Sequence, residues 1–136
     1  MDAIDNTVPA PAPGFRDHPD YSITIDAHAG HVRAIFAGQI IAETDRAVLL
    51  QEENHSPVYY LPLDDFQRAF LRPSDHTTYC PFKGTASYFA ITANGRTSEN
   101  TIWHYPAPYA EVFAIKGFAA FYVDRLDALE MGPRHG

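Results

Sequence analysis

Short apolar stretches rich in β-branched and aromatic residues, separated by tight turn sequences, recur along this chain and constrain its fold more than any other feature. Residues 32–36 and 40–43 flank Ala37, Gly38 and Gln39, and glycine tolerates the positive φ that a tight hairpin turn requires. Asn94 and Gly95 form a second turn of this kind. Strands joined by such turns pair antiparallel. The sequence therefore predicts a mainly β fold of antiparallel strands.

Other stretches extend this pattern. Residues 46–52 and 57–61 are rich in β-branched, leucine and aromatic side chains, and the polar residues 53–56 between them predict a further turn. An antiparallel meander is the simplest arrangement of these strands. Residues 118–123 predict a buried closing strand, and residues 109–116 predict one or two helical turns.

The hydrophobic period changes over residues 62–71. Leu63, Phe66 and Phe70 fall at helical spacing, and acidic residues precede basic ones along the segment. Pro73 disfavours helical geometry in the residue before it. The sequence predicts a short amphipathic helix here, ending before Pro73.

The length of 136 residues fits one domain. A composition of 46% hydrophobic and 20% charged residues is that of an ordinary soluble globular protein. Residues 1–20 hold four prolines, which block regular backbone pairing, so we expect a flexible, proline-rich arm there. We expect a single mainly β domain over residues 21–130.

Charge and residue spacing exclude several classes of function. A net charge of -7 disfavours binding to nucleic acid, which needs clustered Lys and Arg side chains. No apolar run is long enough to cross a bilayer and the N-terminus lacks signal-peptide features, so we expect a cytoplasmic protein without membrane contact. The seven histidines and one cysteine show no metal-ligand spacing, so we expect neither metal nor cofactor. The oligomeric state stays open.

Residues 73–84 concentrate reactive side chains between two prolines and a glycine. Cys80 is a candidate nucleophile, because Lys83 and His76 would favour its thiolate if they face it; the alternative is a small buried hydrophobe. His76, oriented by Asp75 or another carboxylate, is a candidate general base; the alternative is a loop histidine bonded to a backbone carbonyl. We therefore treat His76, Cys80 and Lys83 as the candidate catalytic groups.

Lys83 is one of only two lysines and stands between Phe82 and Gly84 rather than on a charged face. A lysine in such an apolar setting requires a partner. Two interpretations are equally supported: Lys83 holds an anionic ligand, or it pairs with a carboxylate of Glu52 or Asp64.

Further residues are candidates for the wall of a ligand site. Thr78 lies on the same face as Cys80 if the segment is extended, and Asn100 can both donate and accept hydrogen bonds. The alternative is that such groups only satisfy the backbone of a long loop. Aromatic side chains could line a pocket or fill the core. The candidate ligand-binding residues are Arg46, Glu52, Tyr60, Asp75, Thr78, Tyr88, Asn100 and Trp103.

Several motifs also match a known family: PVYYLP at residues 57–62, SDHTTYCPFKGTASY at residues 74–88, and the later Asn100, Trp103 and Tyr105. On these residues the chain resembles DUF427, family 427 of the domains of unknown function, also labelled nucleotidyltransferase-like, over roughly residues 30–125. The resemblance implies a single compact, mainly β domain of coiled antiparallel sheets with one or two short helices, similar to the fold of methionine sulfoxide reductase B and the translationally controlled tumour protein. It implies no particular reaction.

Together these features predict a small cytoplasmic β domain with a cleft that binds a small polar or anionic molecule, with catalysis on that molecule left open. The alternative is a non-catalytic structural or protein-interaction module. The two interpretations differ in one structural respect: whether Cys80, His76 and Lys83 share a concavity that solvent can reach.

Overall fold

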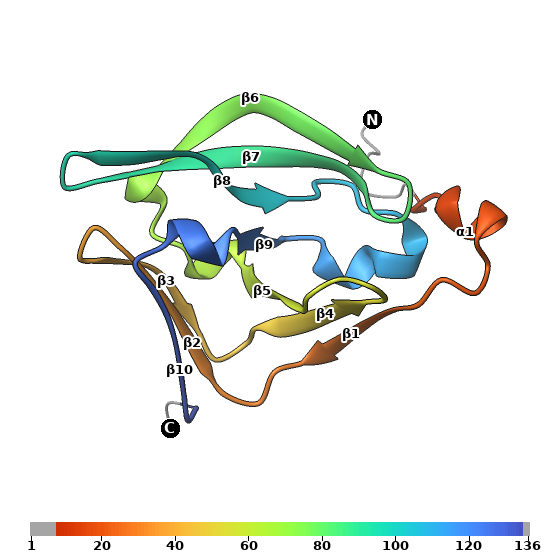
Figure 1. Cartoon of the computed structure of the whole chain (residues 1–136), viewed down its shortest axis with the longest axis horizontal. Helices are drawn as coiled ribbons and strands as arrows, with labels where there is room; N and C mark the ends of the chain where they lie inside the picture. The colour runs from red at the N-terminus through yellow and green to blue at the C-terminus, as the bar shows by residue number, and fades with distance from the viewer. Residues whose placement is uncertain (1–7, 135–136) are drawn as a thin grey trace.

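The computed structural model describes residues 8–134, and in this part of the chain ten strands form two antiparallel sheets (Figure 1). The larger sheet has the strand order β1-β4-β5-β9-β8-β7-β6. Its strands are β1 (Ile23–Ala27), β4 (Val48–Glu52), β5 (Val58–Pro62), β9 (Phe118–Phe121), β8 (Arg96–His104), β7 (Gly84–Ala93) and β6 (Leu71–Cys80). The smaller sheet has the order β10-β2-β3, with β10 (Ala128–Gly132), β2 (His31–Phe36) and β3 (Gln39–Thr44). The prediction of a mainly β fold in antiparallel sheets is confirmed.

Helical structure in the described residues is short. One α-helical turn, α1 (Gly14–Asp17), precedes the sheets. The other helical elements are 3₁₀ turns: η2 (Leu63–Asp65), η3 (Arg68–Phe70), η4 (Ala110–Ile115) and η5 (Val123–Arg125). The predicted helical turns over residues 109–116 therefore correspond to η4.

Both predicted hairpin turns are present. Ala37 and Gly38 have φ angles of 51° and 76° between β2 and β3, and Asn94 and Gly95 have φ angles of 49° and 78° between β7 and β8. Positive φ at both central residues gives a turn whose twist matches that of the flanking strands. These two turns set the register of the strand pairs next to them, and each hairpin shifts register farther along, between Ala34 and Ile35 and between Phe89 and Ile91.

Two hydrophobic clusters lie on opposite faces of the larger sheet, because successive side chains of a strand point to opposite sides. Leu61 of β5 belongs to the first cluster, which also contains side chains from β2 and β3 of the smaller sheet. Tyr60, the preceding residue, belongs to the second cluster, together with Tyr105 and residues of η4. The second cluster is rich in tyrosine, and the candidate site lies there.

The predicted helix over residues 62–71 is wrong. Phe66 has extended backbone angles and forms a bridge with Ala42, and the Gln67 amide donates to the Ile41 carbonyl at 2.7 Å. These contacts with β3 split the segment into η2 and η3. The helical spacing of the apolar residues reflects burial against β3 rather than an α-helix, since backbone pairing outweighs a short periodic signal.

The reactive segment from Pro73 onward forms most of strand β6, and Pro73 does not stand at the end of a helix. Strand β6 pairs with β7 at one edge of the larger sheet, and its register shifts between Pro73 and Thr77. Proline fits this position because it lacks an amide donor and is tolerated at sheet edges and bulges. Most side chains of β6 are exposed.

Residues 8–20 of the expected arm contact the turn between β6 and β7, near which α1 lies in Figure 1. The Gly14 amide donates to the Pro81 carbonyl at 2.9 Å, and the rings of Phe15 and Phe82 meet edge-to-face with centroids 4.9 Å apart. Residues 1–7 of the arm lie outside the described residues. The domain boundaries stay a prediction, as does the likeness to the reductase and tumour-protein fold. Across residues 8–134, the structure contains no helix with the length and apolarity needed to span a membrane.

Candidate functional site

Aromatic side chains form a row across the face of the larger sheet that carries the second cluster. Tyr88 of β7 is opposite Trp103 of β8, and Trp103 is opposite Ala120 of β9. The register of β5 against β9, extended by one position, brings Tyr60 beside Ala120. Because Ala120 is small, the indole of Trp103 reaches across it and donates from Nε1 to the Tyr60 hydroxyl at 3.2 Å.

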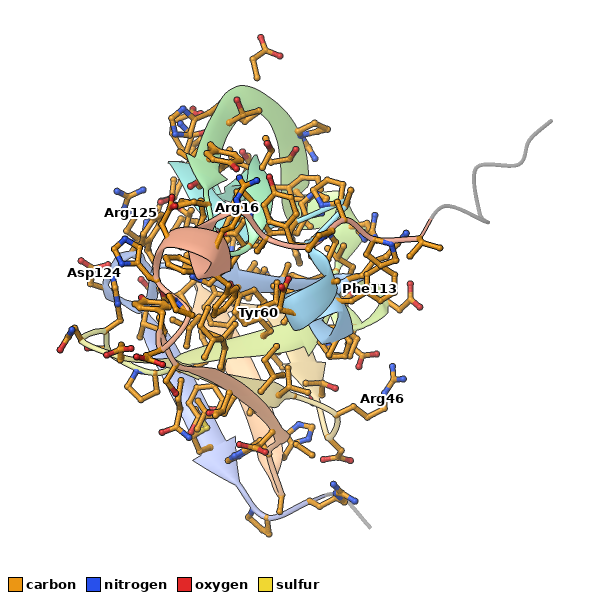
Figure 2. The ribbon with its side chains drawn as sticks, turned by 90° about the vertical axis from the view of Figure 1, so that its right-hand side faces the viewer. Arg16, Arg46, Tyr60, Phe113, Asp124 and Arg125 are labelled. Atoms are coloured by element: carbon orange, nitrogen blue, oxygen red, sulfur yellow. The ribbon has the colours of Figure 1, made fainter. Side chains whose placement is uncertain are left out.

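The molecule is hollowed beside this row, with a volume of about 280 Å³. We call this hollow the aromatic concavity. Figure 2 shows Tyr60 in the interior of the molecule, between the strands. The residues that line the concavity come from strands β4, β5, β7 and β8, from the segments that follow β4, β8 and β9, and from the turn between β6 and β7. They are Leu50, Glu52, His55, Ser56, Val58, Tyr60, Lys83, Tyr88, Trp103, Tyr105 and Tyr122.

Lys83 and Glu52 form an ion pair in the wall of the concavity. The distance between Lys83 Nζ and Glu52 Oε1 is 2.5 Å, and the side chains are only 11% and 10% exposed. The Tyr21 hydroxyl donates to the other carboxylate oxygen of Glu52. Burial alone would raise the pKa of Glu52, but the hydrogen bonds from Lys83 and Tyr21 hold its pKa below the ordinary value. Glu52 is therefore ionised at neutral pH, and the pair has no net charge.

The local backbone explains how Lys83 reaches this position. Gly84 has φ 119°, and a β-carbon there would come within 3.3 Å of the Ala107 carbonyl oxygen. The Lys83 carbonyl accepts from the Tyr109 amide at 3.0 Å. Glycine thus lets the turn between β6 and β7 pack closely on residues 107–109. This packing directs Lys83 inward, where it is 8% exposed.

Two buried tyrosine hydroxyls in the concavity keep hydrogen-bonding capacity. Tyr60 is 2% exposed, and its only hydrogen bond within residues 8–134 is the one that it accepts from Trp103, which leaves its own O–H proton free to donate. Tyr105 is 7% exposed, and its hydroxyl has no hydrogen-bond partner in the same part of the chain. Burial raises the pKa of both tyrosines, so both keep their protons and act as donors.

The three candidate catalytic residues are not brought together. Lys83 lines the concavity, and Cys80 lies beside it with Sγ 3.9 Å from Nζ, partly buried against the second cluster. His76 is exposed on β6 and does not line the concavity; its ring packs on that of Tyr88 with centroids 4.7 Å apart. The residues therefore do not share one concavity.

Some of the candidate ligand-binding residues line the concavity and others do not. Glu52, Tyr60, Tyr88 and Trp103 line the aromatic concavity. Thr78 is exposed but connects to it, because its hydroxyl is 2.9 Å from that of Tyr88.

The remaining candidates lie elsewhere. Asn100 accepts from the Ser74 hydroxyl at 2.5 Å, a contact between β8 and β6. Arg46 donates to Asp65 at 3.2 Å and is 67% exposed; Figure 2 shows it at the periphery, away from the labelled Tyr60. Asp75 is exposed on β6. These residues do not line the concavity.

Seven residues of the site, counting Tyr21, were not among the predicted site residues, and two of them are the apolar Leu50 and Val58. Tyr105 and Tyr122 directly follow β8 and β9, which are neighbouring strands. The alternation of side chains along these strands could have predicted that both tyrosines lie on one face of the sheet. His55 and Ser56 belong to the loop after Glu52. The contact of Tyr21 with Glu52 could not be predicted from the sequence, because only the tertiary fold brings the two residues together.

The described residues do not form a metal-binding cluster. Between residues 8 and 134, His, Cys, Asp and Glu side chains do not gather in groups of three or more that would suit a metal ion. The expected absence of metal and cofactor stays a prediction.

The fold and this site define a mainly β protein with an aromatic-walled concavity that contains one buried, neutral ion pair. The family model described as Domain of unknown function (DUF427) matches residues 24–132, and the chain belongs to this family. The predicted family membership is thus confirmed over a slightly longer range. No curated protein matches the chain.

Proposed function

We propose that the aromatic concavity binds a small molecule through a polar head group that accepts hydrogen bonds. The observation that carries this proposal is the pair of phenolic donors, Tyr60 and Tyr105. Both are more than nine-tenths buried, and neither proton has an acceptor in the described residues. Among residues 8–134 the one fully buried side-chain polar atom without a partner is Arg33 Nε, so the Tyr105 hydroxyl is in contact with solvent in the concavity. Replacing that water with a ligand acceptor exchanges one hydrogen bond for another in a setting of low dielectric. A carboxylate or carbonyl oxygen of a ligand would satisfy both donors.

The charge and the volume of the concavity limit the class of ligand that it can bind. The positive charge of Lys83 is offset by Glu52, so the concavity suits a neutral or singly charged acceptor. A triphosphate carries several charges and is bound in proteins by clusters of Arg, Lys or metal ions. The volume of about 280 Å³ lies at the lower limit of small-molecule sites, which begin near 300 Å³. Both features favour a small polar molecule over a nucleotide.

The proposed activity is binding rather than catalysis. A general base must come within hydrogen-bond reach of the reacting proton, and His76 does not line the concavity. Cys80 is adjacent to Lys83 but is not among the lining residues either. We propose that the protein performs this function in the cytoplasm and without nucleic acid, for which its net charge of -7 is unfavourable.

One observation favours the alternative of a structural module. Tyr21, Glu52 and Lys83 connect three segments that are distant in sequence: the start of the domain, the end of β4 and the turn after β6. Such a network would fix the fold without any ligand. It does not account for the donors of Tyr60 and Tyr105, which take no part in it.

Binding of acetate and acetamide, followed by calorimetry or by chemical-shift titration, tests the proposal. Tyr105→Phe removes one donor and no protein hydrogen bond, so we expect roughly tenfold weaker binding with unchanged stability. Tyr59→Phe is the matched control, because Tyr59 precedes Tyr60 on β5 and packs against the first cluster. Binding that both variants weaken equally, or no binding to the unaltered protein, would contradict the proposal.

A further inference from the structure

We infer that the ligand of the aromatic concavity is a planar ring bearing a carboxylate or carbonyl group, with the ring against Trp103 and Tyr122 and the acceptor directed to Tyr60 and Tyr105. This inference rests on the proposed function and adds the part of the ligand that the phenolic donors do not specify. Two observations support it: the aromatic composition of the walls of the concavity, and the difference in solvent exposure between its inner and outer residues.

The walls are aromatic on several sides. Tyr60, Tyr88, Trp103, Tyr105 and Tyr122 make up five of the eleven lining residues. Aromatic rings attract other rings in offset or edge-to-face arrangements, beyond the burial of apolar surface. A saturated chain of the same size gains only the burial term. The composition of the walls therefore favours a flat, conjugated ligand.

The orientation of the outer rings is fixed by protein contacts. The rings of Trp103 and Tyr122 lie 4.7 Å apart at 46°, and those of Trp103 and Tyr60 lie 6.4 Å apart in an edge-to-face arrangement. The guanidinium of Arg125 lies 4.5 Å from the centre of the Tyr122 ring. Trp103 and Tyr122 are thus held in place before any ligand arrives, which lowers the entropic cost of binding.

The solvent exposure of the lining residues indicates how the ligand is oriented in the concavity. Tyr122 is 37% exposed, whereas Tyr60 and Tyr105 are 2% and 7% exposed. The aromatic side chains with most solvent contact therefore lie at the mouth, and the unused donors lie at the floor. A ligand with one polar end would enter with that end first and leave its ring beside Trp103 and Tyr122.

The charge of the site selects against an amine in place of the acceptor. Both oxygens of Glu52 already accept hydrogen bonds, from Lys83 and from Tyr21. An ammonium head group would meet the Lys83 charge and would leave the donors of Tyr60 and Tyr105 unused. The volume of about 280 Å³ limits the ligand to about one ring with its head group.

Three probes of similar size test the inference: benzoate, cyclohexanecarboxylate and benzylamine. We expect benzoate to bind about three- to tenfold more tightly than cyclohexanecarboxylate, which has the same head group on a puckered ring. We expect benzylamine to bind most weakly. Dissociation constants from chemical-shift titration of the full chain at one pH and salt concentration provide the comparison.

Tyr122→Leu separates the ring contact from the head-group contact, since it leaves the donors of Tyr60 and Tyr105 in place. We expect it to weaken benzoate binding about three- to tenfold and to change cyclohexanecarboxylate binding less than twofold. Tyr79→Leu is the matched control, because Tyr79 is 58% exposed and lies outside the concavity.

The outcomes separate the two proposals. Equal affinities for the two acids, or tighter binding of benzylamine, would overturn the inference about the ring while the acids still bind. Failure of both acids to bind would overturn the proposed function itself. Selectivity for benzoate that disappears in Tyr122→Leu and persists in Tyr79→Leu would support both.

Discussion

The ammonium group of Lys83 lies 2.5 Å from a carboxylate oxygen of Glu52, and both side chains are about nine-tenths buried. The pair joins the turn after β6 to the end of β4 in the wall of the aromatic concavity. Breaking a buried ion pair by removing one partner is costly, because the remaining charge stays desolvated. The pair therefore gives the first prediction.

Lys83→Met is expected to lower the free energy of unfolding by about 3 kcal/mol at pH 7. In the unaltered protein the pKa of Glu52 is held below its ordinary value, so its stabilising contribution is present above that value and is lost as pH falls through the folded pKa. In Lys83→Met, burial without the ammonium would favour the protonated carboxyl. The deficit should therefore shrink as pH falls from 7 to 4.5.

Urea denaturation at the two pH values measures this change. The double variant Glu52→Gln/Lys83→Met is the control, since it carries no unpaired charge and should recover part of the stability. An identical deficit of the single variant at both pH values would show that Lys83 contributes through packing alone.

His31 predicts a pH dependence of the opposite sign. Its Nδ1 lies 2.7 Å from Asp45 and its Nε2 lies 3.0 Å from Glu43. The hydrogen bond to Asp45, helped by that to Glu43 and opposed by burial, raises the pKa of His31 above its ordinary value of 6.5. The stabilisation is thus fully present below about pH 6.5 and is lost as pH rises through the folded pKa.

We expect the stability of the unaltered protein relative to His31→Gln to decline between pH 6 and pH 9. Chemical denaturation across this range measures the difference between the two proteins, in which contributions from other titrating groups cancel. A constant or increasing difference with rising pH would contradict the account of His31.

The contacts of residues 8–20 predict that this segment stabilises the domain. Gly14 donates to Pro81, and Phe15 packs on Phe82, next to Lys83 in the turn. Deletion of residues 1–20 is expected to cost at least about 2 kcal/mol, the contribution of this hydrogen bond and this aromatic pair alone. Deletion of residues 1–7 alone is the control. If both truncated chains unfold at the same urea concentration, residues 8–20 form the flexible arm that their prolines predict.

The turn that positions Lys83 gives a further prediction. Gly84→Ala is expected to destabilise the protein by about 1 to 3 kcal/mol, because alanine at φ 119° is strained and its β-carbon would approach the Ala107 carbonyl oxygen. Gly95→Ala separates the two effects, since Gly95 has φ 78° and no neighbouring atom within 4 Å. A thermal unfolding midpoint of Gly84→Ala at or above that of Gly95→Ala would contradict the close packing of the turn.

Local sequence chemistry predicted the fold class and the hairpins, and tertiary pairing decided the rest. Ala37-Gly38 and Asn94-Gly95 specify their turns through the φ angles that only a few residues adopt. Phe66 was assigned to a helix by spacing, but its backbone pairs with Ala42, a residue far away in the sequence. A periodic pattern of three residues cannot report such a partner.

The candidate site was likewise predictable only where a local sequence signal pointed to it. Lys83 was identifiable because a lysine in an apolar segment requires a partner, and Glu52 was one of the two partners proposed. His76 was grouped with Lys83 by proximity in sequence, but β6 is an extended edge strand, and His76 is exposed on it. The role proposed for Tyr105 rests on the low exposure of its side chain in the tertiary structure, which composition does not reveal.

The most direct test of the account follows the tyrosine rings themselves. In protein labelled with ¹³C at the tyrosine ζ-carbon, titration with benzoate should shift the resonances of Tyr60 and Tyr105, because their hydroxyls are the proposed donors, and leave Tyr59 and Tyr79 unchanged. Single Tyr→Phe variants assign the four signals. Saturation of the protein with benzoate while the Tyr60 and Tyr105 resonances stay in place would contradict the central claim that these buried hydroxyls bind the ligand.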